Sequence, residues 1–372
     1  MNPKAVFRAV IFALGWGLVA SPAALADDSA AAIAAGGLVA RRETRIVMAR
    51  EVLQISVKKI VVDYDFRNDT DQDVTTEVAF PVPPYTNGIV EGPAPEEQSF
   101  QNFKLWVNGQ PAHYDSQATA TLKGKDVTGI LRANHIDVAT FGHFDWVESS
   151  NHESKPISQD LSRLPKPVRD NLVRENLFDG DGPDDSQAGL WTVHLQYHWT
   201  QTFPAHSTVH IRHEYSPVVG FEMMPRETID LFLMTANERQ AAKFKYPPPP
   251  QDLKFLGSFC PKISMLHGIQ QKLNDDNSSG DHSVFPQWVD FILTSANTWK
   301  RPIEDFTLII ERPKPEHGGK VFINFCPPAN GEVEKTDVDL FQLHLTNFVP
   351  VSELHIGFFD VPQAKAAQPE AK

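Results

Sequence analysis

Short runs of β-branched and aromatic residues, each ended by proline or by asparagine and aspartate, recur along most of this chain. Residues 190–203 alternate apolar and polar side chains, residues 207–215 do the same, and Pro204-Ala205-His206 joins them. Alternation with a period of two places one set of side chains on each face of a strand. These segments predict a β-hairpin, and the whole pattern restricts the chain to sheets whose apolar faces must be covered.

Other strand-like segments surround this pair. Residues 52–66 and 74–82 predict a second hairpin-like pair, because the polar run at 68–73 between them has the chemistry of a turn. Asn108-Gly109, a strong hairpin signal, predicts another pair over residues 103–114. Strands in the C-terminal half are expected at residues 289–294, 306–311, 321–325, 340–347 and 354–360.

Helical spacing is confined to a few segments. Residues 166–178 have it, and Asp126 could cap a short helix that runs to Asn134, which together predict a partly helical insertion spanning residues 115–189. Residues 253–273 also have helix-like apolar spacing, interrupted by Pro261. Helix is therefore expected as an addition to a strand-rich framework.

We therefore predict a mainly β protein with two consecutive β-sandwich-like domains, because many short strands must pair their apolar faces. The first domain is expected over residues 27–220, including the insertion at 115–189, and the second over 221–360. Residues 361–372 are rich in alanine, proline, lysine and glutamine and are expected to form a disordered tail.

The first 26 residues have the features of an export signal. Lys4 and Arg8 precede an apolar run at 9–20, and Ala24-Leu25-Ala26 provides the small-x-small pattern for cleavage after Ala26. The apolar run is too short for a membrane-spanning helix, and no stop-transfer segment follows it. We expect a periplasmic or secreted protein without a membrane span.

The charge balance excludes several kinds of partner. The whole chain has a net charge of −13, and removal of Lys4 and Arg8 with the signal leaves 32 basic and 47 acidic residues, a net charge of −15. Such a field repels phosphates and anionic lipids, so we expect no nucleic-acid partner. Cationic partners stay open, and the acidity also keeps an exported protein in solution.

The chain has two cysteines, Cys260 and Cys326, each preceded by phenylalanine and followed by proline. In an oxidising compartment, two thiols in one exported chain most simply form one disulfide. A reactive or metal-binding thiol pair is the alternative. We expect the disulfide, since the flanking residues suit fixed corners of the chain.

Two groups of residues are candidate metal sites. Asp179, Asp181 and Asp185 lie on a glycine-containing turn where carboxylates could bind Ca²⁺, although the EF-hand register would place Pro183 at a ligand position. A solvated turn is the alternative.

The second candidate consists of His194 and His198, which share one face of the strand at 190–203, and His210 from the next strand. Three imidazoles could bind Zn²⁺, but residues four apart on a strand are separated by roughly 13 Å. The polar outer face of a half-buried sheet is the alternative. We predict no resident cofactor, with Ca²⁺ and Zn²⁺ left open at these two places.

Several segments resemble a known family. They are residues 27–30 with 36–39, 64–83, 103–109, 124–128, 199–205 with 213–217, and 289–306. These segments resemble the exported bacterial family called domain of unknown function 4424, along nearly the whole chain after the signal. The resemblance implies a fold class and a location in the bacterial envelope, and it implies no catalytic residues. The N-terminal half also has a weaker similarity to VIT-type β-sandwich domains.

Familiar catalytic motifs are absent from the sequence, which has no Gly-x-Ser-x-Gly, His-Glu-x-x-His or Cys-x-x-Cys. We therefore favour a non-enzymatic binding or interaction module that takes an envelope protein or a small ligand through sheet edges or through the insertion. The alternative is an exported metal-dependent or hydrolytic enzyme that uses the histidine face or the aspartate turn.

Overall fold

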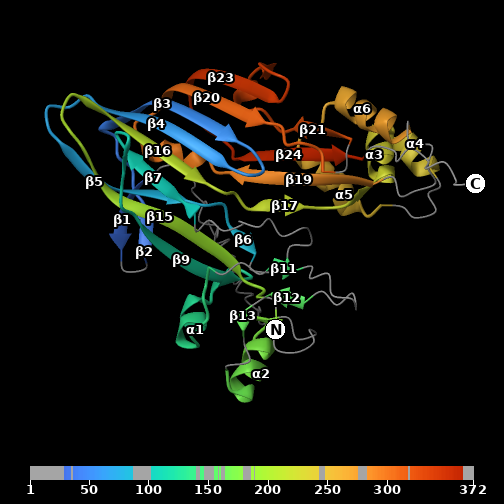
Figure 1. Ribbon diagram of the computed structural model, residues 1–372, viewed down its shortest axis with the longest axis horizontal. Helices are drawn as coiled ribbons and strands as arrows, with labels where there is room; N and C mark the ends of the chain where they lie inside the picture. Colours follow the sequence, from blue (N-terminus) through green and yellow to red (C-terminus); the bar gives the residue numbers. More distant parts are fainter. Residues whose placement is uncertain are drawn as a thin grey trace, which may run out of the picture.

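The computed structural model describes twelve stretches of the chain (Figure 1). They are residues 29–34, 37–86, 102–139, 143–145, 155–157, 159–160, 164–178, 186–187, 189–242, 248–274, 283–316 and 319–362. The predicted signal peptide and the aspartate turn at 179–185 lie outside them, as do residues 363–372 of the predicted tail. The protein is mainly β, as the sequence predicted.

The largest sheet combines strands from both halves of the chain. Its order is β22 (Glu334–Lys335), β23 (Leu340–Phe348), β20 (Ile303–Glu311), β3 (Ile46–Ile55), β4 (Ile60–Asn68), β16 (Ser207–Tyr215), β7 (Lys104–Val107) and β8 (Gln110–Pro111). β20 pairs parallel with β3, and Figure 1 shows the red and orange strands beside the blue ones. A boundary at residue 220 therefore passes through one hydrogen-bonded sheet instead of between two sheets.

A second sheet has seven strands. They are β10 (Lys125–Asp126), β9 (Asp115–Leu122), β15 (Thr192–Phe203), β5 (Val74–Pro81), β1 (Ser29–Ala34) and β2 (Gly37–Ala40), with β6 (Tyr85–Thr86) also paired to β15. β9 lies within the predicted insertion yet pairs with β15 along residues 115–121. The start of that segment is thus part of the sheet, and its helices are α1 (Thr128–Ala133) and α2 (Lys166–Arg174).

The predicted hairpin over residues 190–215 is wrong. β15 pairs with β5, β6 and β9, whereas β16 pairs with β4 and β7 in the other sheet. The predicted pair over 52–82 is wrong in the same way, because the real hairpin is β3 with β4 and the next strand crosses to the second sheet. Alternation shows which face of a strand is buried, but it does not show which strand is the neighbour.

Buried Asn68 joins the two crossovers. Its side-chain Nδ2 donates to the carbonyl oxygens of Phe203 and Gln72, at 2.9 and 2.8 Å. Phe203 ends β15, and Gln72 lies in the polar run between β4 and β5. One buried amide therefore contacts the β4–β5 and the β15–β16 connections, at each of which the chain passes from one sheet to the other.

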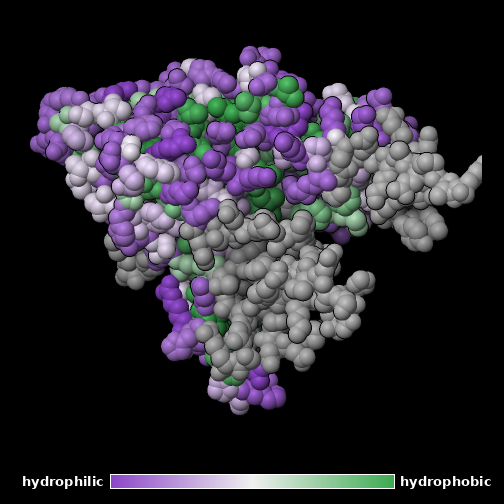
Figure 2. Space-filling model, viewed as in Figure 1, coloured by the Kyte–Doolittle hydropathy of each residue, from purple (hydrophilic) through white to green (hydrophobic). Residues whose placement is uncertain are grey.

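The two sheets pack on each other through aromatic side chains. The ring centroid of Phe66 on β4 lies 5.7 Å from that of Phe203 on β15. Both rings contact Trp299, which directly follows the short 3-10 helix η2 (Thr294–Thr298). The outward faces are polar. Figure 2 shows mainly hydrophilic residues, with hydrophobic ones between them, over the part of the view that β20, β3 and β4 occupy.

A smaller, five-stranded sheet carries four helices. Its strands are β17 (Val219–Phe221), β19 (Ser283–Phe291), β24 (Leu354–Val361) and β21 (Lys320–Asn324), with β18 (Met224–Pro225) also paired to β19. The helices are α3 (Arg226–Leu233), α4 (Ala236–Ala241), α5 (Pro250–Ser258) and α6 (Ile263–Asn274). The helical segment predicted at 253–273 is confirmed as α5 and α6, which are separated near Pro261 as expected.

This sheet has two buried faces. Val289, Ile356 and Phe358 belong to the main core, whereas Phe359 and Val361 pack with the helices. The remaining short elements are β11 (His143–Asp145) with β12 (Lys155–Ile157), β13 (Gln159–Asp160) with β14 (Ser186–Gln187), and the 3-10 helix η3 (Pro328–Asn330).

Candidate functional site

The three histidines considered for Zn²⁺ do not come together. His194 and His198 lie on the outer face of β15, because the intervening Leu195 and Tyr197 point into the core. His210 lies on the outer face of β16, in the opposite sheet. The hydrophobic core therefore separates His210 from the other two.

Each of these histidines contacts a polar or acidic side chain on a neighbouring strand. His198 Nδ1 lies 2.7 Å from Glu77 Oε1, and His194 Nε2 lies 2.9 Å from Thr121 Oγ1. Burial lowers the pKa of His194 below its usual value. His210 sits between two carboxylates, with Nδ1 2.9 Å from Asp65 and Nε2 3.3 Å from Asp63.

These contacts are typical of side chains on the polar outer faces of sheets, which was the alternative to a Zn²⁺ site. Within the described stretches, no group of three or more histidine, cysteine, aspartate or glutamate side chains is placed to hold a metal ion. Ca²⁺ binding by Asp179, Asp181 and Asp185 stays a prediction, since that turn lies outside those stretches.

A histidine that the sequence did not single out lies inside the core. His213 is completely buried on β16, and rings of Phe80, Phe103 and Trp199 surround it with centroids 4.9 to 5.3 Å away. Burial lowers the pKa of His213 from 6.5 to about 3. The imidazole is therefore neutral at physiological pH and serves as part of the core.

This burial predicts a pH-dependent stability. The unfolded chain protonates this histidine near pH 6.5 and the folded chain only near pH 3, so the unfolded state binds more protons in between. The free energy of unfolding should then fall as the pH drops through this window, by up to about 1.4 kcal/mol per pH unit. His213→Phe should remove this contribution in urea unfolding measured between pH 4 and 7. His113→Gln, at an exposed position, should keep the wild-type slope, and an unchanged slope in His213→Phe would contradict the prediction.

A different site emerges on the helix-covered face of the five-stranded sheet. Four residues that are register partners form one row across β17, β19, β24 and β21. They are Gly220, Trp288, Gly357 and Asn324, in that order. The next row along β19 and β24 pairs Asp290 with His355. Because residues two apart share a face, both rows belong to the same surface.

Two glycines make room for large rings on this surface. A Cβ at Gly220 would lie 2.0 Å from the Trp288 indole, and a Cβ at Gly357 would lie 2.8 Å from the Phe259 ring. No side chain fits either distance without displacing a ring. The glycines therefore determine where Trp288 and Phe259 lie.

Asp290 and His355 form a half-exposed pair beside these rings. His355 Nδ1 lies 2.5 Å from Asp290 Oδ1, and the two side chains are 31% and 46% exposed. The imidazole stacks on Phe259 at 4.1 Å and 15°, and its centroid lies 6.4 Å from that of Trp288. With Nδ1 engaged by the carboxylate, Nε2 is the ring nitrogen left for a further interaction.

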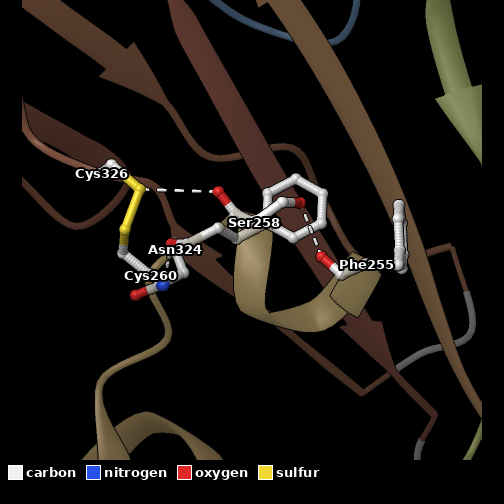
Figure 3. The surroundings of a disulfide bond; sticks show 6 residues. Phe255, Ser258, Cys260, Asn324 and Cys326 are labelled. Carbon is white, nitrogen blue, oxygen red and sulfur yellow. Dashed lines mark hydrogen bonds between the residues drawn. A yellow bond between two sulfur atoms is a disulfide. The ribbon is translucent and has the colours of Figure 1, made fainter. Parts of the chain in front are cut away.

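The structure confirms the predicted disulfide next to this surface. Cys260 follows α5 and Cys326 follows β21, and their Cα atoms are 5.1 Å apart (Figure 3). Asn324 Nδ2 donates to the Phe259 carbonyl oxygen in the same place. The disulfide therefore attaches the end of α5, which carries Phe259, to the sheet.

The sequence offered little signal for this site. Asp290 and His355 stand 65 residues apart in two strand-like runs, where each looks like an ordinary polar residue. The signals present in the sequence were the glycines at 220 and 357 within strand-like segments, because glycine in a strand indicates that another group approaches the backbone closely.

The fold and this surface define a class of mainly β protein. Helices cover one face of its five-stranded sheet, a disulfide joins the end of α5 to that sheet, and aromatic rings lie beside a His–Asp pair on the same face. The chain belongs to the family Domain of unknown function (DUF4424), whose model matches residues 26–356. This match confirms the resemblance found in the sequence. No curated protein matches the chain.

One similar solved structure is a candidate nutrient-binding protein from Legionella pneumophila subsp. pneumophila str. Philadelphia 1. It is 13% identical, with 85% of this chain and 68% of that chain covered and a TM-score of 0.36. Within the described stretches, no helix is both long and apolar enough to cross a membrane.

Proposed function

We propose that this protein is an exported, non-enzymatic binding module that takes a small ligand on the surface formed by Trp288, His355 and Asp290. The observation that supports this proposal is the placement of a half-exposed His–Asp pair beside a half-buried indole. Ligand sites combine apolar and aromatic surface with a few placed polar groups, as this surface does. The disulfide is consistent with export, and the N-terminal signal predicts it.

The geometry suggests the chemistry of the ligand. Trp288 and Phe255, whose centroids are 5.0 Å apart, present apolar surface, while His355 Nε2 and the Asp290 carboxylate present hydrogen-bonding groups. A small molecule with a flat apolar part and a polar group on one edge would satisfy both. The net negative charge of the chain favours a neutral or cationic ligand over an anionic one.

A thermal-shift screen of the full exported chain tests this proposal. Amino acids, amines, sugars and nucleosides are the probes, and a ligand at a hundred times its Kd should stabilise the protein by about 2.7 kcal/mol. His355→Gln and Asp290→Asn should each reduce the shift to near zero for the compound found. His344→Gln is the matched control, because His344 forms a similar pair with Asp305 on another strand pair, at 3.1 Å.

The same variants also test the alternative that the protein is an enzyme. A His–Asp pair is also part of the machinery of many hydrolases. Hydrolysis of p-nitrophenyl esters by the wild type, lost in His355→Gln and kept in His344→Gln, would contradict a non-enzymatic role. A screen without any stabilising compound would contradict small-ligand binding at this surface.

A further inference from the structure

The Cys260–Cys326 disulfide is accessible from solvent, although the residues before both cysteines are buried. Phe259 and Phe325 lie in the interior, whereas Cys260 and Cys326 are both exposed. Cleavage of a disulfide requires a thiolate to reach one of its sulfur atoms. Access to this bond therefore needs no opening of the fold.

The surroundings also hold the helix end in place without the S–S bond. Asn324 Nδ2 donates to the Phe259 carbonyl oxygen, and the Phe259 ring packs on the rings of His355 and Phe359, both on β24. Cys326 Sγ lies 3.5 Å from the Ser258 carbonyl oxygen, which would accept a hydrogen bond from a thiol at that position (Figure 3). The dithiol form thus has partners ready in the folded protein.

His355 lies against the residue that precedes Cys260. Phe259, adjacent to Cys260 in sequence, stacks on the His355 ring. Through Phe259, the His355 ring therefore helps to hold the chain that leads into Cys260.

From these observations we propose that Cys260–Cys326 is a site of reversible thiol–disulfide exchange with an external dithiol, with His355 as a positioning residue. A thiolate of the dithiol attacks Cys260 Sγ, the S–S bond breaks, and Cys326 leaves as a thiolate that takes up a proton. The second thiolate of the dithiol then attacks the dithiol sulfur that is bonded to Cys260 Sγ, the mixed disulfide breaks, and Cys260 leaves as a thiolate that takes up a second proton. The protein disulfide gains two electrons and two protons, and the dithiol becomes a disulfide.

Reduction of the folded full exported chain by dithiothreitol tests the proposal. The free thiols are trapped with a polymer-linked maleimide and counted by the gel shift, while far-UV circular dichroism reports the fold. We expect complete reduction with an unchanged spectrum, at a rate that low urea does not alter. Reduction that occurs only in urea concentrations that unfold the chain would overturn the exchange site.

The role of His355 has a separate measurement. The rate, normalised to the dithiothreitol thiolate concentration, should fall in His355→Gln, which removes the ring that stacks on Phe259, and return to the wild-type value in His355→Phe, which keeps a ring there. The loss in His355→Gln should be on the order of tenfold, because displacing a reacting group from its position slows a reaction by about that much or more. His344→Gln should behave as the wild type, and equal rates in the wild type, His355→Gln and His344→Gln would overturn the positioning role. Because ligand binding is not measured, failure here leaves the binding proposal intact.

Discussion

Replacing Trp299 with alanine is expected to lower the free energy of unfolding by about 3 to 5 kcal/mol, the cost of removing a fully buried tryptophan. Trp299 is completely buried, and its ring centroid lies 4.8 Å from Phe66 of β4 and 5.8 Å from Phe203 of β15. It thus fills space between two strands that lie before residue 220, although it comes from the segment after that residue. Urea unfolding followed by tryptophan fluorescence and far-UV circular dichroism measures the loss.

The same experiment tests whether the two halves of the chain share one core. Because β20 pairs with β3 and Trp299 packs between β4 and β15, we expect one transition with both probes. Trp106→Ala is the matched control, since Trp106 is only half-buried and its loss should cost much less. Two separate transitions, or equal losses in the two variants, would contradict a core shared across residue 220.

Replacing both Cys260 and Cys326 with serine is expected to lower the free energy of unfolding by about 4 kcal/mol. The cysteines are 66 residues apart, and the loop-closure entropy that a bond over this separation removes from the unfolded chain corresponds to that amount. Chemical unfolding of the oxidised wild type and the double variant measures the difference.

Dithiothreitol provides the control for this prediction. It should lower the stability of the wild type to about that of the double variant and leave the double variant itself unchanged. A double variant as stable as the oxidised wild type would show that the crosslink contributes nothing to stability. Serine is chosen because both positions are exposed, so its hydroxyl is solvated.

The strand content was readable from the sequence because alternation of apolar and polar residues is a local property. The C-terminal strands at 306–311 and 340–347 and the helix break near Pro261 are confirmed by β20, β23, α5 and α6. Strand partners were not readable, because the same alternation suits any neighbour that covers the apolar face. The segment at 204–206 looked like a hairpin turn and is a crossover between sheets.

The candidate site shows the same division. The disulfide was predictable because an exported chain with two cysteines has one simple pairing. The histidines at 194, 198 and 210 drew attention through their spacing along neighbouring strands, yet the crossover puts them on opposite outer faces. His355 and Asp290 meet through the register of β19 and β24, to which local spacing contributes nothing.

The sequence by itself therefore determined the mainly β class, the cysteine pair and the family, because each depends on local pattern, composition or likeness along the chain. Only the tertiary structure decided which strands share a sheet, and so which side chains meet. Strand pairing is set by contacts between segments far apart in the chain, such as β3 with β20 across more than two hundred residues. The surface around Trp288 and His355 exists only as a result of such pairings.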